Sequence, residues 1–563
     1  MKAVDWLVDY LIKLGCTDVF GIPGVVVMDF LYAVEARKNE ITPHLSYHEQ
    51  AASYAACGYA QVNGKLGVAY STRGPGFTNM ITAISDAYYD SIPTLFITAH
   101  SSIDLNSDIR VLANQEIDTV CMVKNVTKFA TRLDSIDNFQ DTIVKACKCA
   151  FEGRKGPVFL DIYNGLFFLD VPLNCESIFK SQNDKDIHEI VNELETIIKK
   201  HNRPVILIGN GARSDNSSFL LSEISTKFNI PILSSRVSQD IVPNCNKYFG
   251  FIGSRATRYS NFVLSKSDLI ISLGNRLSFP LNSKSFRSII EKCDIVRVDI
   301  DEREFLRKLP NCKCFKADVA ELLPVLVNSD LNYSNSHKWV SVCEYLRLKL
   351  AQWDLNNVVN CLINLMRSSE SEMPFVCDVG NNSFWVSTAY AYSLVSNRII
   401  YSGSFGALGC ALPKSIGAYY SEICPVICFT GDQGIQFNIQ ELQYISKYKL
   451  PITIVILNNA SSGMIMEREK NKYGNHLVHT TTRDGYSFPD FQKLANCYCI
   501  DYLRVNTSES IYSFDNLDLS LPRIIEMIIS VNKELRPSLP QENSCQNLSP
   551  ELPKELFEEL DIL

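Results

Sequence analysis

The sequence predicts an α/β protein of three doubly wound, parallel-sheet domains followed by a C-terminal tail. Two observations support this fold class. Short, nearly continuous apolar runs such as TLFITA (94–99) and PVILIG (204–209) alternate with amphipathic, helix-like stretches. Such runs are typical of parallel strands that helices cover on both faces. The chain also has 563 residues, enough for three to four domains of about 150 residues each.

Two polar segments divide the chain. SQNDKD (181–186) and NSDLNYSNSH (328–337) are rich in polar residues, as linkers between periodic segments are. They predict a first domain over residues 1–175, a middle domain over 185–328 and a third domain over 340–535.

Within these domains, eight apolar runs are predicted strands: 66–71, 94–99, 157–162, 204–209, 269–274, 295–300, 425–431 and 452–458. The first and third domains have similar lengths, which is compatible with a duplicated architecture. Residues 536–563 are Pro-rich and then acidic and amphipathic. They predict a tail that packs across another domain or subunit.

Composition and charge argue against several classes of protein. Lys and Arg number 54 against 62 Asp and Glu, a formal net charge of −8, whereas a nucleic-acid binder needs a basic face. No apolar run approaches the roughly 18 residues of a membrane span. Asp5 and Asp9 interrupt the apolar N-terminus, which a signal peptide would not allow. We therefore expect a cytoplasmic protein that binds neither nucleic acid nor a membrane.

The 19 cysteines are scattered along the chain. Three pairs have CxC spacing: Cys147/Cys149, Cys312/Cys314 and Cys497/Cys499. No CxxC partner follows them at the spacing of a zinc site. We therefore expect reduced thiols, buried or half-buried, as in a cytosolic protein.

The most informative segment is GDQGIQFNIQEL (431–442), followed by LNN (457–459). A buried strand ends there in a turn of small residues that opens a helix, whose N-terminus favours an anion. Asp432 and Asn459 are separated by enough chain for one helix and one parallel strand, so both side chains can reach the same sheet edge. Their oxygens suit Mg²⁺ together with phosphate oxygens. An acidic turn with Asp432 as helix cap is the alternative.

Further segments resemble one known family in a consistent order. SYHEQAA (46–52), STRGPGFTN (71–79) and SGSFGALG (402–409) accompany the GD-x-G … NN arrangement. Together they resemble the acetolactate synthase-like branch of thiamin diphosphate-dependent enzymes, over about residues 1–535. In such enzymes the cofactor carries the chemistry and the protein supplies orientation and electrostatics.

The resemblance implies roles for residues around the organic part of thiamin diphosphate. Glu49 matches the catalytic carboxyl group that hydrogen-bonds the aminopyrimidine ring nitrogen, and an apolar pocket would favour its neutral form. Leu408 matches the bulky side chain beneath the bend of the cofactor. The carbonyl of Gly406 should accept a hydrogen bond from the pyrimidine amino group.

It also implies how the diphosphate end is held. Asp432 and Asn459 should ligate Mg²⁺ through their side chains, and Ser461 through its carbonyl oxygen. Asn381 and Asn382 match positions that contact the diphosphate, although a polar turn after a strand could also be only a cap. The remaining expected cofactor-binding residues are Gln433, Gly434, Gly463 and Met464.

Some positions depart from the family pattern. Gln433 replaces the usual glycine, which would be costly if that backbone needs a positive φ. Arg468 replaces the tryptophan that helps true acetohydroxyacid synthases to choose the acceptor. It is a candidate substrate residue, suited to a carboxylate or phosphate, or else a surface partner of Glu467 or Glu469.

Two further features of the family are less well matched. The paired histidines of pyruvate decarboxylase-type enzymes are absent, and His100 stands alone. It is either a catalytic proton relay or a structural residue. The GxG at Gly209–Gly211 is a weak sign of a nucleotide site. Acetolactate synthases bind FAD in their middle domain. Here we expect instead that the middle domain is structural and binds no FAD.

The resemblance implies decarboxylation of a 2-keto acid, with pyruvate the expected donor, and carboligation of the resulting enamine to a second carbonyl. A simple 2-keto acid decarboxylase and a non-catalytic regulatory relative are alternatives. A carboligase acting on a nucleotide-linked keto-sugar is another, because LSPELP (548–553) resembles tails of relatives associated with surface-polysaccharide synthesis. Since the family places Glu49 and Asp432 of one site on different chains, we expect a homodimer or homotetramer.

Overall fold

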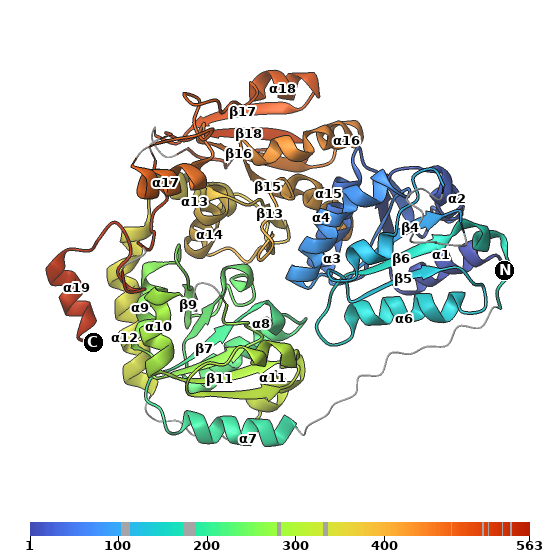
Figure 1. Ribbon diagram of the computed structural model, residues 1–563. Coiled ribbons are helices and arrows are strands. Elements are labelled where there is room, and N and C mark those ends of the chain that lie inside the picture. The colour runs from blue at the N-terminus through green and yellow to red at the C-terminus, as the bar shows by residue number, and fades with distance from the viewer. Residues whose placement is uncertain are drawn as a thin grey trace.

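The computed structural model describes residues 1–102, 113–172, 187–278, 283–329, 331, 336–474, 476–508, 512–515, 517–531, 533–540 and 543–563. Over these residues the chain forms three six-stranded sheets with parallel strand pairs and flanking helices (Figure 1). This confirms the predicted α/β class. The linker expected at 181–186 lies outside the described residues, as does part of the one expected at 328–337.

The first sheet, on the right of Figure 1, has the strand order β2-β1-β3-β4-β6-β5. Its strands are β1 (Asp18–Gly21), β2 (Thr42–Leu45), β3 (Gly67–Tyr70), β4 (Thr94–His100), β5 (Phe129–Leu133) and β6 (Val158–Tyr163). Its helices are α1 (Ala3–Lys13), α2 (Met28–Glu35), α3 (Glu49–Asn63), α4 (Pro75–Asp90), α5 (Thr119–Val123) and α6 (Phe139–Phe151). Successive strand residues face opposite sides. Val19 therefore packs with α1, α2 and α6, and Phe20 with α3 and α4.

The third sheet, at the top of Figure 1, has the order β14-β13-β15-β16-β18-β17. Its strands are β13 (Phe375–Cys377), β14 (Ile399–Tyr401), β15 (Val426–Gly431), β16 (Ile452–Asn458), β17 (Asp501–Asn506) and β18 (Arg523–Ile528). Its helices are α13 (Asn357–Arg367), α14 (Asn381–Ser393), α15 (Ala411–Glu422), α16 (Leu442–Tyr448), α17 (Gly463–Tyr473) and α18 (Phe491–Cys497). Counted along the chain, this order is the same as in the first sheet, as a duplicated architecture requires.

The middle sheet has a different order, β12-β11-β10-β7-β8-β9. Its strands are β7 (Pro204–Ile208), β8 (Ile232–Ser234), β9 (Tyr248–Phe251), β10 (Leu269–Leu273), β11 (Asp294–Asp299) and β12 (Cys312–Lys316). Its helices are α7 (Ile187–Ile198), α8 (Ser217–Phe228), α9 (Arg258–Lys266), α10 (Lys284–Lys292) and α11 (Val319–Val327), with α12 (Ser336–Leu350) packed on α9. The eight predicted strands are all present in the three sheets, with ends that differ by at most one residue.

The first and third domains share one hydrophobic core, in which α3 packs along α15. Two glycines permit this close approach. A Cβ on Gly58 would lie 2.1 Å from the carbonyl oxygen of Lys414, and one on Gly417 would lie 1.8 Å from that of Ala55. The contact is reciprocal, because each glycine meets a residue three positions before the other glycine.

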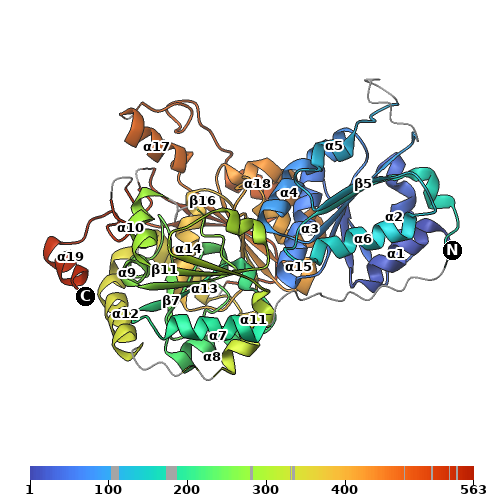
Figure 2. The ribbon, with the colours of Figure 1, turned by 60° about the horizontal axis from the view of Figure 1, so that its bottom comes forward.

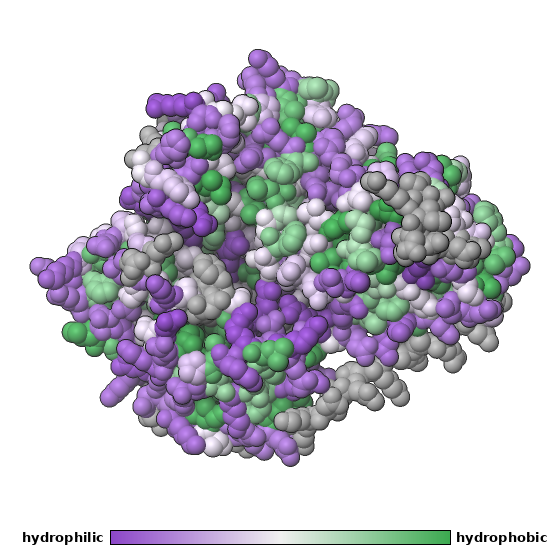
Figure 3. Space-filling model, in the orientation of Figure 1, coloured by the Kyte–Doolittle hydropathy of each residue, from purple (hydrophilic) through white to green (hydrophobic). Residues whose placement is uncertain are grey.

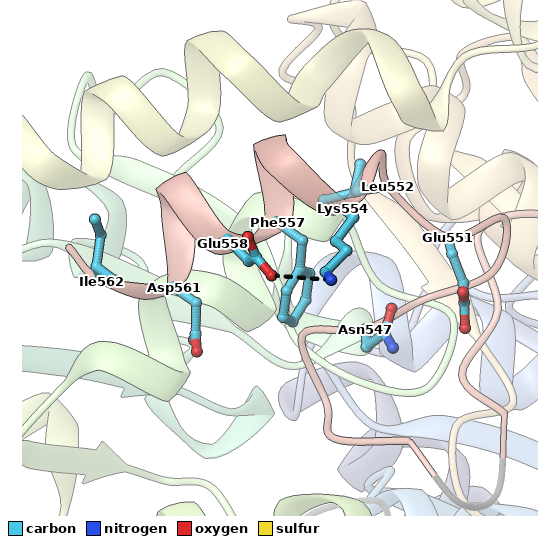
Figure 4. A pocket seen from close by; sticks show the side chains of 8 residues that line it. All are labelled: Asn547, Glu551, Leu552, Lys554, Phe557, Glu558, Asp561 and Ile562. Atoms are coloured by element: carbon cyan, nitrogen blue, oxygen red, sulfur yellow. Dashed lines mark ion pairs between the residues drawn. The ribbon is translucent and has the colours of Figure 1, made fainter.

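The tail crosses the middle domain and ends in α19 (Lys554–Asp561), which lies beside α9 and α12 in Figures 1 and 2. The buried Arg258 anchors it, donating to the carbonyls of Leu548 (2.9 Å) and Pro550 (2.6 Å). An open pocket within the tail (Figure 4) shares no residue with the site described below. Among the described residues, no helix is both long and apolar enough to cross a membrane.

Candidate active site

The carboxyl ends of β15 and β16 bring together the two side chains expected to bind a metal. These strands are adjacent and parallel, with Gly431 opposite Leu457, so Asp432 and Asn459 follow them at the same sheet edge. Asp432 is only 2% exposed. One carboxylate oxygen accepts from the Gln433 amide (3.1 Å), whereas the other has no hydrogen-bond partner within the described chain.

Burial of this carboxylate has an electrostatic cost. It raises the pKa of Asp432 to about 7, although the nearby Tyr486 hydroxyl and the main-chain amides of Gln433 and Ser461 lower it. A bound cation would compensate such a carboxylate, because an uncompensated buried charge is unfavourable. Among the described residues, no group of three or more His, Cys, Asp and Glu side chains is arranged to hold a metal ion. Amide, main-chain and diphosphate oxygens would therefore complete the ligand set, as suits Mg²⁺.

Asn381, at the start of α14, lies close to Asn459. A Cβ on Gly463 would lie 2.4 Å from Nδ2 of Asn459 and 2.8 Å from Nδ2 of Asn381. Gly463 therefore leaves the space in which the two amides approach each other. In the described structure, Oδ1 of Asn381 and Oγ of Ser461 are also buried without partners. Buried polar atoms normally have hydrogen-bond partners. The unpartnered oxygens of Asn381, Asp432 and Ser461 are therefore suited to a bound metal ion and diphosphate.

Asn382 is held differently. Its side-chain amide donates to the carbonyl of Asp378 (3.0 Å), so it completes the turn after β13. This contact supports the capping alternative for Asn382, whereas Asn381 keeps a free oxygen on the site.

Asp378, which the sequence analysis did not single out, organises this edge of the sheet. Its carboxylate accepts from the amide of Gly409 (2.9 Å) and the hydroxyl of Thr430 (2.9 Å), and burial raises its pKa to about 6. A Cβ on Gly434 would lie 2.6 Å from its Oδ2. Gly434 is thus required by packing. Asp378 could have been predicted from the pattern that identified Asp432, an acidic residue directly after a buried strand.

Gln433 does not strain the backbone. It has φ −87° and ψ −45°, a right-handed conformation open to any residue. The segment after it, Gly434–Glu441, is a 3₁₀ helix with a kink at Asn438 (φ −132°) and not the expected regular helix. Asn438 explains the kink, because its side chain donates to the carbonyl of Gly409 (2.8 Å) and to Gln50 (3.3 Å).

The turn that carries Gly406 and Leu408 is fixed from the first domain. Asp90, at the end of α4, accepts from the amides of Gly403 (2.6 Å) and Ser404 (2.9 Å). Gly406 has φ 73°, a region that favours glycine. Leu408 is 37% exposed. An exposed leucine on a tightly held turn is available for contact with a ligand.

Asp86, one helical turn before Asp90 on α4, links the first domain to the third. It accepts from the hydroxyl of Ser402, which in turn accepts from the amide of Gly406 (3.0 Å). It also pairs with Lys414 of α15 (2.8 Å), and both side chains are buried. No sequence pattern predicts this buried pair, because its partners lie more than 300 positions apart.

Glu49 is the first residue of α3. Its Oε2 accepts from the side-chain amide of Asn79 (2.9 Å). A Cβ on Gly76 would lie 3.2 Å from its Oε1, so the Gly-Pro-Gly turn makes room for this carboxylate. The start of α3 also contacts the third domain, because Oε1 of Glu441 accepts from the amide of Tyr47 (2.9 Å).

His100 is bound by carboxylates at both ring nitrogens. Nδ1 lies 2.8 Å from Asp161 and Nε2 lies 2.8 Å from Asp134. The ring is buried, and with both nitrogens engaged this geometry supports the structural alternative over a proton relay.

Arg468 is exposed on α17, which projects from the third domain (Figure 2). The alternative role, an ion pair with Glu467 or Glu469, is not observed. Glu467 binds Arg255 (2.9 Å), and Glu469 accepts from the hydroxyl of Thr480 (2.7 Å). Within the described residues, Arg468 pairs with no carboxylate. Met464, one turn before it, is also exposed.

The GxG of the middle domain is explained by main-chain packing. The amide of Gly211 donates to the carbonyl of Gly274 (3.1 Å), and a Cβ on Gly209 would lie 2.2 Å from the same oxygen. This contact within the protein requires both glycines. Their presence is therefore weak evidence for an FAD site.

Three consecutive domains of the chain match models of one family. The N-terminal TPP binding domain of thiamine pyrophosphate enzymes matches residues 1–124, the central domain 191–326 and the C-terminal TPP binding domain 378–514. Together these matches cover more than half of the chain. The protein therefore belongs to the thiamine pyrophosphate-dependent enzymes, and its cofactor is thiamin diphosphate.

Within this family the chain is similar to acetolactate synthase large subunits. It is 28% identical to that of Porphyra purpurea and to that of Lactococcus lactis, in each case over 94% of this chain and 92% of the relative. It is also 28% identical to the large subunit of isozyme 2 of Escherichia coli, over 89% of this chain and 90% of the relative.

Proposed function

We propose that this protein is a thiamin diphosphate- and Mg²⁺-dependent enzyme that decarboxylates a 2-keto acid, with pyruvate as donor, and joins the remaining unit to a second carbonyl. The observation that carries the proposal is the group of buried, unpartnered oxygens of Asn381, Asp432 and Ser461. It lies where a diphosphate and its cation would be held, in a chain similar to acetolactate synthases.

The cofactor, when bound, supplies the electron sink that decarboxylation of a 2-keto acid requires. Asp432, Asn459 and the main chain of Ser461 would hold the cation, and Asn381 would contact the diphosphate. Glu49 would hold a proton at the pyrimidine nitrogen, in the orientation that Asn79 fixes. Gly406 would accept from the pyrimidine amino group, on a turn that Asp86 and Asp90 hold.

The test is a substrate screen with purified protein, thiamin diphosphate and Mg²⁺. We expect cofactor-dependent CO₂ release from pyruvate and a product whose mass includes the acceptor. CO₂ release with acetaldehyde alone would assign a simple decarboxylase. Cofactor binding without CO₂ release from any 2-keto acid would instead support a non-catalytic relative.

A second candidate concerns the acceptor. The exposed guanidinium of Arg468 favours an anionic second substrate, such as a sugar phosphate or a nucleotide-linked keto-sugar. Arginine presents five donors in a fixed fork that suits carboxylates and phosphates. An uncharged acceptor would gain little from it.

Arg468→Trp is expected to weaken the native acceptor by roughly 1.5–3 kcal/mol, the range for a hydrogen bond to a charged group. CO₂ release from the donor should be unchanged, because the site of decarboxylation is untouched. The measurement compares kcat/KM for acceptor and donor in both proteins. Lys470→Trp, on the same helix, is the control. Efficient acetolactate formation by the wild type, with an unaltered acceptor preference in the variant, would show that Arg468 does not select the substrate.

We also propose that the active form is a homodimer or homotetramer. Large apolar side chains are exposed near both halves of the site: Tyr47, Leu408 and Phe437. Elsewhere, the face drawn in Figure 3 mixes apolar and hydrophilic side chains over all three domains. An obligate interface would bury such apolar groups.

Sedimentation velocity is expected to give a dimer or tetramer whose dissociation on dilution abolishes activity. A fully active monomer at nanomolar concentration would contradict a site shared between chains. Phe437→Glu should weaken the assembly, whereas the exposed Phe219→Glu on α8 of the middle domain should not.

A further inference from the structure

Cys312 and Cys314 lie on β12, the edge strand of the middle sheet. Residues two apart on a strand face the same side, and their sulfur atoms are 3.8 Å apart. Cys314 is exposed and Cys312 is half-buried. The other two CxC pairs differ, because Cys147 and Cys149 lie within α6, and Cys497 ends α18. Residues two apart on a helix point to different faces.

A buried arginine lies opposite this pair. Arg297 of β11 is aligned with Cys314 in the parallel register, so both side chains project from the same face of the sheet. Arg297 is 1% exposed and donates to the carbonyls of Arg307 (3.2 Å) and Arg276 (3.4 Å). Its Nε has no partner, and it forms no ion pair with a carboxylate of the described residues. A thiolate on this face would therefore meet a guanidinium that lies 5.5 Å from the ring of Phe305 but is paired with no carboxylate of the described residues.

The two thiols differ in reactivity. Burial and the neighbouring Cys314 raise the pKa of Cys312 to about 12, against the effect of Arg297 and Lys308. Cys312 is therefore a thiol at neutral pH. The exposed Cys314 is the one that an oxidant in solution can reach, and a neighbouring thiol suits the second, resolving step.

The backbone permits a bond between them. Two residues along a strand place the Cα atoms about 6.6 Å apart, near the upper limit for a disulfide of about 6.8 Å. Bringing the two sulfur atoms from 3.8 Å to bonding distance requires the strand to bend. β12 can bend because, among the described strands, only β11 pairs with it. A disulfide closed with such strain is readily reduced again.

We propose that Cys312 and Cys314 form a reversible disulfide with a hydroperoxide as oxidant. The Cys314 thiol releases its proton and the thiolate attacks the peroxide. The O–O bond breaks, Cys314 becomes a sulfenic acid, and the leaving hydroxide or alkoxide takes up a proton and departs as water or an alcohol. The sulfur of Cys312 then attacks that of Cys314. The S–S bond forms, the S–O bond breaks, and the hydroxide leaves as water with the Cys312 proton. Two thiols lose two electrons and two protons, and the peroxide is reduced.

The test treats the folded wild-type enzyme with hydrogen peroxide, alkylates the remaining thiols and maps them by peptide mass spectrometry. We expect the peptide with Cys312 and Cys314 to lose two hydrogen atoms, and dithiothreitol to restore it. This should occur at least about tenfold faster than any change at Cys497 and Cys499, the exposed control pair of equal spacing.

Single variants separate the two roles. Cys312→Ser should leave a sulfenic acid on Cys314 that dimedone traps, whereas Cys314→Ser should leave Cys312 a thiol. Both keep the size of the side chain, and circular dichroism verifies that they fold. Two results would overturn the proposal: both thiols surviving peroxide that oxidises Cys497, or oxidation of Cys314 in the wild type while Cys312 stays a thiol. Neither depends on whether the enzyme accepts a 2-keto acid.

Discussion

Asp432→Ala is expected to abolish tight binding of thiamin diphosphate. The substitution removes the only charge among the three expected metal ligands, and the diphosphate would then enter without a compensating cation. Changes even beyond the metal ligands typically cost 10–100-fold in metal affinity, so the loss should exceed about a hundredfold. Calorimetric titration of the cofactor, with and without Mg²⁺, measures this directly and does not depend on substrate.

The apo form of the variant should fold at least as well as the wild type. The unpartnered oxygen of Asp432 is buried, and burying an uncompensated carboxylate is unfavourable. Asp432→Asn keeps the shape and tests the charge alone, and Asp515→Ala, at an exposed turn of the same domain, is the control. Normal, Mg²⁺-independent cofactor binding by Asp432→Ala would refute the metal role.

Glu49→Gln is expected to slow activation of the cofactor by at least about a hundredfold, the scale for loss of a positioned acid–base group. Glutamine keeps the size and can still accept from Asn79, but it provides neither the charge nor the proton of the carboxyl group. Cofactor affinity should change little, because the diphosphate site is untouched. The measurement is exchange of the C2 hydrogen of bound thiamin diphosphate in deuterated buffer.

Glu40→Gln, at an exposed position before β2, is the matched control and should exchange at the wild-type rate. Wild-type exchange in Glu49→Gln itself would remove the residue from the catalytic site. If both exchange and cofactor affinity fell, Glu49 would be required for binding.

The central strands could be predicted because their sequences carry the signal. β15 and β16 read as continuous apolar runs, since helices cover both of their faces. β12 was harder to predict, because Lys313 and Lys316 interrupt its apolar pattern and one neighbouring strand of the described sheet constrains it. β13 and β14 have three residues each, too few for a periodic pattern.

At the site, the residues that physical reasoning alone brought together follow strand ends, whereas Glu49, Gly406 and Leu408 were predicted from the family resemblance. Asp432 and Asn459 needed only the rule that parallel strands end at one edge. Asp86 and Lys414 could not be found in this way, because their pairing depends on how two domains pack. Neither could the kink at Asn438, since its cause is a contact with Gly409 made through the fold.

The reciprocal contact of Gly58 and Gly417 has a mechanical consequence. Helices packed this closely leave no room for a hinge between them. We therefore expect the first and third domains to move as one rigid body, and any opening or closing to come from the middle domain and the tail. Each chain then carries the Glu49 half and the Asp432 half at a fixed separation. If two chains share their sites as we propose, two-fold pairing would complete both sites in a single step, and a half-assembled dimer with one finished site could not exist.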